Sequence, residues 1–240
     1  MDTTFVLIPG PWTGAWVWEP VALGLRRQGY DARPVTLSGL DSPDEDVSKI
    51  GLDTHIDDVL SVLETVDQGR VILVAHSYSG IVGGQVADRR PDLVAHTVFV
   101  EGFLPHNGRS MLHAFPERLR ADDLRLIAAN RGRWPAPDAA VVADGQDLTL
   151  RQARWLAERF VGHPGRTVAE PAALTRPLSS LRATYVVCEK EHFGGQISLD
   201  VSALRAEPGW TFESLDTGHW PMVSAPDRLV SLLTAVAARV

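Results

Sequence analysis

Short apolar runs alternate with longer amphipathic segments along most of this chain. Apolar runs such as residues 71–74 (VILV) are typical of strands that are buried on both faces of a parallel sheet. Runs of this kind predict six strands, at residues 4–8, 31–37, 71–74, 96–100, 184–187 and 210–215. The alternation with helical segments therefore indicates an α/β fold, with a mainly parallel sheet of about six strands.

The segments between these runs repeat their apolar residues at helical spacing. The last segment is the clearest, with Leu229, Leu232, Leu233 and Val236 at positions i, i+3, i+4 and i+7. Similar stripes occur within residues 16–27 and 53–64, before the second and third predicted strands. We expect these helices to cover both faces of the sheet.

The alternation breaks after the fourth strand. Residues 105–182 contain helical patterns at 119–130 and 150–161 but no strand of the same quality. We interpret this segment as a helical lid inserted into a core made of residues 1–104 and 183–240.

Composition and charge exclude several classes of partner. The chain has 240 residues, of which 45% are hydrophobic and 22% charged, with a net charge of −7 and one cysteine. An acidic chain without a Lys/Arg cluster predicts no nucleic-acid partner, and no apolar run approaches the length of a membrane span. No secretory signal is evident, so we expect a cytoplasmic protein. No zinc-ligand spacing occurs, and the sequence leaves a monomer and a homodimer both open.

The best candidate for chemistry follows the strand at 71–74. There the sequence Ala75-His76-Ser77-Tyr78-Ser79 places small residues two positions before and after a serine. A sharp strand-to-helix turn needs such small flanks, and it exposes the serine above the sheet as a nucleophile. This is a nucleophile elbow, with Ala75 and Ser79 where glycines are usual. A structural turn is the alternative interpretation.

A nucleophilic serine needs a base and an acid, and each should follow a strand at the carboxyl edge of the sheet. His219 follows the strand at 210–215 and is the predicted base, with His192 as its rival. Glu191 is the predicted acid because it follows the strand at 184–187, as the chain order serine, acid, histidine requires. Glu101, after the strand at 96–100, is the alternative acid.

The motifs together resemble those of the α/β-hydrolase superfamily, over the whole chain. Residues 8–18 (IPGPWTGAWVW) are similar to the HGxxHGAWxW segment of its small esterase, methylesterase and hydroxynitrile lyase group, with Pro9 and Thr13 in place of the two histidines. The resemblance implies a triad of Ser77, His219 and Glu191, with glutamate where aspartate is more usual. It also implies an enzyme that needs no cofactor and no metal.

Two departures from this group bear on the activity. The group's oxyanion hole takes one N–H from the residue after the serine, here Tyr78, and one from the position of Pro11, which has no N–H. Either Trp12 supplies the second N–H through a shifted loop, or the oxyanion hole is defective; we expect Trp12 to supply it. In the hydroxynitrile lyases a lysine follows the catalytic histidine, but here it is Trp220, so cyanohydrin cleavage is not expected.

The predicted function is a serine hydrolase that cleaves a carboxylic ester or lactone of a small apolar substrate. We expect Pro11, Phe103 and Trp220 to line an aromatic pocket for that substrate, because they adjoin the catalytic loops. One alternative is a lyase, cyclase or condensation enzyme on the same scaffold. The other is a small-molecule binding protein with a vestigial triad.

Overall fold

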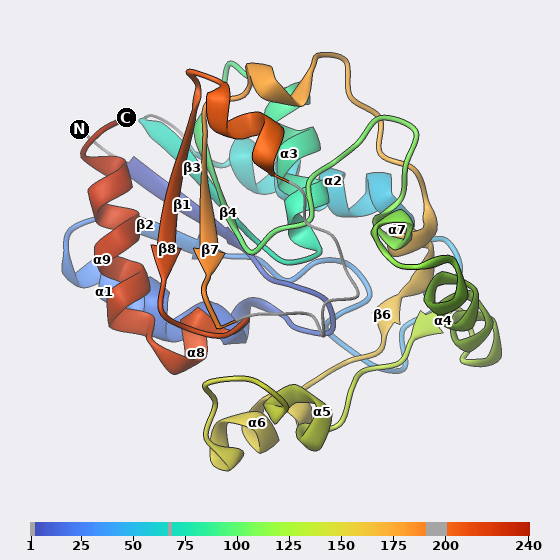
Figure 1. Cartoon of the computed structure of the whole chain (residues 1–240). Coiled ribbons are helices and arrows are strands. Elements are labelled where there is room, and N and C mark those ends of the chain that lie inside the picture. The colour runs from blue at the N-terminus through green and yellow to red at the C-terminus, as the bar shows by residue number, and fades with distance from the viewer. Residues whose placement is uncertain (1–2, 67–68, 191–200) are drawn as a thin grey trace.

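A twisted sheet of six parallel strands forms the centre of the protein. The computed structural model describes residues 3–66, 69–190 and 201–240. The strands lie in the order β2-β1-β3-β4-β7-β8, and every neighbouring pair is parallel (Figure 1). Their bounds are β1 Thr3–Ile8, β2 Asp31–Pro34, β3 Arg70–His76, β4 Val94–Val100, β7 Ala183–Cys188 and β8 Trp210–Leu215. The predicted α/β class and mainly parallel sheet are confirmed.

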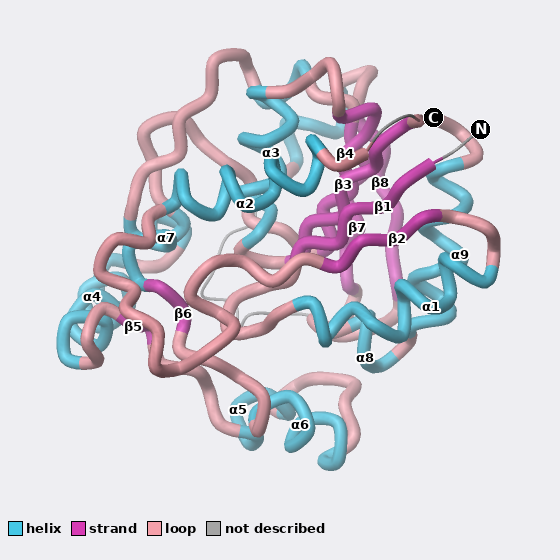
Figure 2. Tube along the Cα trace, turned by 180° about the vertical axis from the view of Figure 1, so that it is seen from behind, coloured by secondary structure: helices cyan, strands magenta, loops and turns pink. Residues whose placement is uncertain are grey.

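Helices cover both faces of this sheet (Figures 1 and 2). One face carries α1 (Glu19–Arg27), α8 (Pro221–Ser224) and α9 (Pro226–Ala237), which pack on one another. The other face carries α2 (Leu52–Glu64) and α3 (Ser79–Arg89). The described residues also form short 3-10 helices: η1 Ala15–Trp18, η2 Met111–Ala114, η3 Leu178–Ser180 and η5 Ser202–Ala206.

The two-sided cover explains the uninterrupted apolar runs. Successive side chains of a strand point to opposite faces, so a strand covered on both sides must be apolar throughout. In β1, Phe5 and Leu7 belong to the core beneath α1 and α9, whereas Val6 and Ile8 belong to the core beneath α2 and α3. All four side chains are fully buried.

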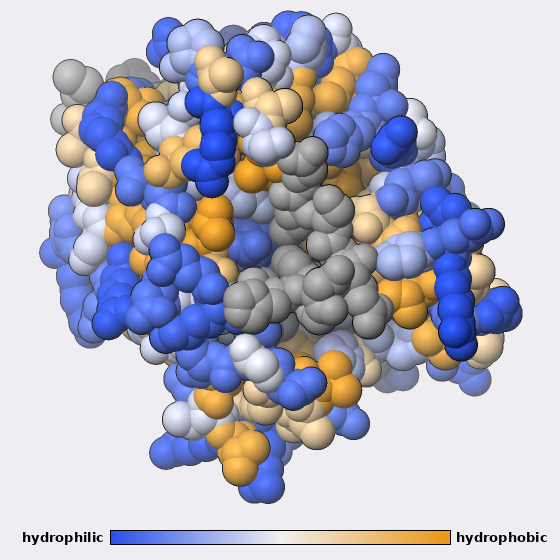
Figure 3. Space-filling view, in the orientation of Figure 1, coloured by the Kyte–Doolittle hydropathy of each residue, from blue (hydrophilic) through white to orange (hydrophobic). Residues whose placement is uncertain are grey.

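The segment between β4 and β7 lies at one end of the sheet (Figure 2). It carries four helices and a short antiparallel ladder: α4 Glu117–Ala129, β5 Arg133–Trp134, α5 Ala139–Ala143, α6 Leu150–Ala157, β6 His163–Pro164 and α7 Gly165–Ala169. The sequence pattern did not predict the β5–β6 ladder, because two residues are too short to show a period. Most of the large apolar side chains that are exposed among the described residues lie on this segment, at Leu124, Leu126, Val141 and Leu150. Figure 3 shows that apolar and polar residues are interspersed over the face of the molecule seen in Figure 1.

One predicted strand ends earlier than expected. The strand predicted at 31–37 ends at Pro34, the last residue that pairs in the ladder with β1. None of the described helices is long and apolar enough to cross a membrane.

Candidate active site

The turn between β3 and α3 holds Ser77 in a strained conformation. Its φ angle is 54°, in the left-handed region that non-glycine residues rarely adopt. The N–H of Ser77 donates to the Val100 carbonyl at 3.1 Å, and the Ser77 carbonyl accepts the N–H of Phe103 at 2.9 Å. A Cβ on Gly80 would lie 2.4 Å from the Phe103 carbonyl oxygen, so only glycine fits where α3 starts beside the end of β4. These contacts form the sharp turn that the sequence predicts.

Ser79, the small residue two positions after Ser77, also makes a hydrogen bond. The hydroxyl of Ser79, which stands where glycine is usual, donates to the carbonyl of Pro9 in the loop after β1. Gly10 lies so close to the elbow that a Cβ there would be 2.7 Å from Nδ1 of His76 and 3.2 Å from Cβ of Ser77. The β1 loop and the elbow are therefore packed directly against each other.

His219 meets Ser77 across the carboxyl edge of the sheet. Its Nε2 lies 2.9 Å from Oγ of Ser77, within hydrogen-bond distance. The main chain of His219 is held on both sides: its N–H donates to Oε1 of Gln146 at 2.5 Å, and its carbonyl accepts the Nε2–H of His76 at 2.7 Å. His76 is thus a buried support for His219, and Gln146 anchors it from the segment between β4 and β7.

Burial sets the protonation state of this pair. Desolvation lowers the pKa of His219 to about 4, because the buried imidazole loses the hydration that stabilises its charged form. At neutral pH the ring is uncharged, and its Nε2 can accept the Ser77 proton. The geometry and the charge state together permit general-base activation of the serine.

Of the two candidate acids, only Glu101 lies within the described residues. Glu191, the predicted acid, lies outside the described residues. Glu101 follows β4, is buried, and has a φ angle of 45°. Its Oε2 accepts the N–H of Cys188, at the end of β7, at 2.6 Å.

The loop after β1 is held by residues from the segment between β4 and β7. Pro11 is buried and has no N–H to donate. Trp12 has a φ angle of 63°; its N–H is directed at Nδ1 of His163 at 3.4 Å, and its carbonyl accepts the N–H of Val161 at 2.9 Å. Trp12, Ser77 and Glu101 thus combine positive φ angles with positions at this edge of the sheet. Strained backbone of this kind clusters at functional sites.

Sequence reasoning missed two buried histidines beside the elbow. A histidine in an amphipathic helix such as the one predicted at 53–64 is more often solvated than functional, but His55 is fully buried, with Nδ1 2.9 Å from the Tyr78 hydroxyl. Its spacing from Leu52 and Val59 puts it on the buried stripe of α2, a signal that could have located it. His163 is also fully buried, and its ring meets that of Tyr78 edge-on at 4.5 Å. Nothing in the local sequence indicates that contact.

Aromatic rings surround the catalytic loops. The ring of Trp220 lies 5.6 Å from that of His219 and is buried. Trp12 packs on Trp134 at 4.5 Å, and Phe103 stacks on Phe115 at 6.0 Å. Phe103 therefore adjoins Ser77 through its main-chain N–H, and Trp220 adjoins His219 through its ring.

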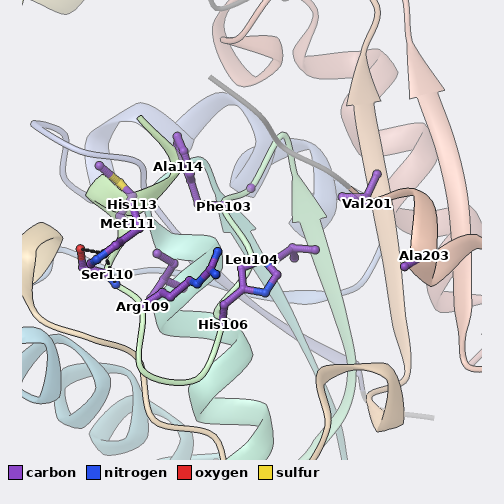
Figure 4. Close-up of a pocket in the computed structure, with 12 residues that line it drawn as sticks. Phe103, Leu104, His106, Arg109, Ser110, Met111, His113, Ala114, Val201 and Ala203 are labelled. Atoms are coloured by element: carbon purple, nitrogen blue, oxygen red, sulfur yellow. Dashed lines mark hydrogen bonds between the residues drawn. The ribbon is translucent and has the colours of Figure 1, made fainter. Parts of the chain in front are cut away.

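A cavity of about 390 Å³ opens next to Phe103 (Figure 4). Its lining is apolar at Ile81, Phe103 and Met111, and polar at His106 and Arg109. Ser77 and His219 are not among the described residues that line it, but the Phe103 backbone connects the cavity to the elbow. Within the described residues, no group of three His, Cys, Asp or Glu side chains is arranged to hold a metal ion.

Comparison with known proteins gives consistent matches over nearly the full chain. A family model described as "Alpha/beta hydrolase family" matches residues 5–232. The carbendazim hydrolyzing esterase of Nocardioides sp. (strain SG-4G) is 28% identical over 97% of this chain and 98% of the relative. The probable esterase PIR7A of Oryza sativa subsp. indica is 29% identical over 98% of this chain and 97% of the relative. An extracellular alpha/beta-hydrolase from a Paenibacillus species has a TM-score of 0.84 at 20% identity, covering 98% of both chains, a likeness of fold alone.

Proposed function

The chain belongs to the alpha/beta hydrolase family, and we propose that it is a serine hydrolase that cleaves a carboxylic ester or lactone of a small apolar substrate. A hydrolase of the carboxylic-ester type agrees with relatives named as esterases. The observation that carries the proposal is the 2.9 Å separation between Oγ of Ser77 and Nε2 of His219, on a strained elbow.

The proposed reaction has two halves. In the first, neutral His219 accepts the Ser77 proton while Oγ attacks the ester carbonyl; the imidazolium then gives that proton to the departing alkoxide. An acyl-enzyme and a free alcohol result. In the second half, His219 takes a proton from water, the hydroxide attacks the acyl carbon, and Ser77 is released with its proton restored.

An acidic side chain is needed to hold His219 in the tautomer that leaves Nε2 free to accept. We assign this role to Glu191, which follows β7 in the chain order serine, acid, histidine. Glu101 is the alternative. The Cys188 N–H holds its Oε2 beside the end of β7, and Glu101→Gln tests this alternative.

The oxyanion of the tetrahedral intermediate needs N–H donors in front of the elbow. We propose the N–H of Tyr78, at the start of α3, and the N–H of Trp12. The close approach of Gly10 to Ser77 supports a place for the β1 loop at this side of the reacting carbonyl. The apolar part of the substrate would contact Phe103, Trp220 and Pro11, which adjoin the catalytic loops.

A fluorophosphonate probe together with p-nitrophenyl esters of graded chain length tests the proposal. Wild-type protein should be labelled at Ser77 and should hydrolyse the esters, and Ser77→Ala should lose both activities. Ser231→Ala, on the exposed side of α9, is the matched control and should keep both. Labelling at another residue, or turnover that persists in Ser77→Ala, would refute the assignment. Labelling without turnover of any ester would favour lyase or condensation chemistry, or a binding protein.

A further inference from the structure

Four buried polar side chains beside the elbow have no part in the mechanism above. His55, Tyr78, His163 and Thr167 are each at most 1% exposed. They come from α2, the elbow, β6 and α7, so the chain brings them together from three distant segments. Buried polar groups must be hydrogen-bonded, and their bonds can be followed atom by atom.

The protons of His55 follow from its two partners. Its Nε2 lies 2.9 Å from the carbonyl oxygen of Ser38, which can only accept, so Nε2 carries the proton. The Nδ1 atom of the neutral ring is then an acceptor, and it receives the hydroxyl proton of Tyr78 at 2.9 Å. Burial lowers the pKa of His55 to about 4, which keeps the ring neutral.

The protons of His163 follow in the same way. The Thr167 hydroxyl donates its only proton to the Pro164 carbonyl at 2.7 Å, so it accepts the Nε2–H of His163 at 2.9 Å. The Nδ1 atom of His163 is therefore left with a lone pair. That lone pair faces the N–H of Trp12 at 3.4 Å.

We propose that His163 is a positioning residue for the oxyanion loop: its Nδ1 lone pair holds the Trp12 peptide beside the elbow, while its ring packs on Tyr78. His163, from the segment between β4 and β7, thus contacts both proposed oxyanion donors, Trp12 and Tyr78. The inference depends on the proposed function and adds a residue to it.

Two features of Trp12 explain why the loop needs such a support. The positive φ of 63° is strained, and it persists only where neighbouring groups fix it. Pro11 cannot supply the usual donor, so the loop depends on the N–H of the next residue. A 3.4 Å bond to a neutral ring is long, and the charged oxyanion is a stronger acceptor. The N–H can therefore turn to the oxyanion as charge develops there.

A pair of substitutions separates this role from simple packing. His163→Leu keeps a side chain of similar size without an acceptor, whereas His163→Asn can place its amide oxygen where Nδ1 lies. We expect His163→Leu to lower kcat on a p-nitrophenyl ester by about 10- to 100-fold with KM little changed, since a whole oxyanion donor is worth about 10²–10³. We expect His163→Asn to recover most of that loss. Fluorophosphonate labelling rates should follow the same order.

A measurement on the wild-type protein avoids any failure of the variants to fold. In protein labelled with ¹⁵N, the amide proton of Trp12 should move downfield when a phosphonate adduct forms on Ser77, because the N–H turns to the phosphoryl oxygen. An unmoved resonance would overturn the inference. Equal kcat losses in both variants, or a rise of kcat in His163→Leu, would overturn it as well. Ser77→Ala run in parallel keeps the two proposals apart, because only persistent hydrolysis in that variant contradicts the function itself.

Discussion

Mild acid should destabilise this protein well before its carboxylates titrate. Burial lowers the pKa of five histidines below the ordinary value: His55, His76, His96, His163 and His219. The folded state therefore resists protonation, whereas the unfolded chain takes up a proton at each histidine near pH 6.5. The stability that these groups contribute is present above pH 6.5 and is lost as the pH falls towards the folded pKa.

The size of the effect follows from the shifts. For His55, His96 and His219 the folded pKa is about 4. Between pH 7 and pH 5.5, each such group should lower the free energy of unfolding by about 1 kcal/mol, because the unfolded state gains most of a proton that the folded state does not bind. Burial also lowers the pKa values of His76 and His163 well below the ordinary value, so these two groups add to the loss in the same direction. Domains of this kind are stable by only about 5–15 kcal/mol, so the loss is large.

Urea unfolding at pH 7.0 and pH 5.5 measures this loss, and His96 offers the cleanest variant. It is buried at the start of β4, away from the elbow, with Nε2 2.9 Å from the Thr184 hydroxyl. In His96→Gln, the loss between the two pH values should be smaller than in wild type by about 1 kcal/mol. His106→Gln, at an exposed position, is the matched control and should lose as much as wild type.

A loss in His96→Gln equal to that of the wild type would refute the reasoning, since His96 would then take up its proton equally in both states. Activity offers an independent check at the active site. On a p-nitrophenyl ester, kcat/KM should hold its plateau well below pH 6.5, because His219 remains neutral until the pH approaches about 4. A fall of kcat/KM centred near pH 6.5, in protein that is still folded, would contradict the burial of His219.

The remaining predictions concern the acid and the oxyanion loop, and both are read from kcat on the same esters. Glu191→Gln should lower kcat by about 10³–10⁴, as for triad carboxylates, and Glu101→Gln by much less; the reverse ranking would move the acid to the end of β4. Pro11→Ala restores an N–H at the usual donor position and should leave kcat unchanged, because Trp12 is proposed to supply that donor already; a rise of kcat by up to about 10² would contradict the assignment to Trp12.

The sequence was most informative where one local property determines the structure. Burial on both faces forces an apolar run, so the strands were predictable, and the run at 210–215 coincides with β8. The elbow was predictable because its steric demand falls on adjacent residues. Ser77 and its small neighbours satisfy that demand within a few positions of the chain.

Long-range polar contacts were not predictable in the same way. The contact between His163 and Trp12 joins residues 151 positions apart, and that between His55 and Tyr78 joins residues 23 apart. The spacing of apolar residues along the chain does not predict such contacts, because they depend on how segments that are distant in the sequence pack together. The positive φ angles of Trp12 and Glu101 were also not predictable, because neither residue type favours a left-handed backbone.

Two of the residues that depart from the family motif make hydrogen bonds that hold the loop after β1. Proline at position 9 and threonine at 13 replace the two histidines of the HGxxHGAWxW segment, and serine at 79 replaces the usual glycine of the elbow. In the structure, the Ser79 hydroxyl donates to the Pro9 carbonyl, and the Thr13 hydroxyl donates to the Gly10 carbonyl at 3.0 Å. These two bonds tie the loop to the elbow and to itself, while His163 ties it to the far segment through Trp12. The acceptor at position 9 is a main-chain carbonyl that any residue presents, so the bond depends on the serine at 79 and on the path of the loop, which a motif scored position by position cannot register.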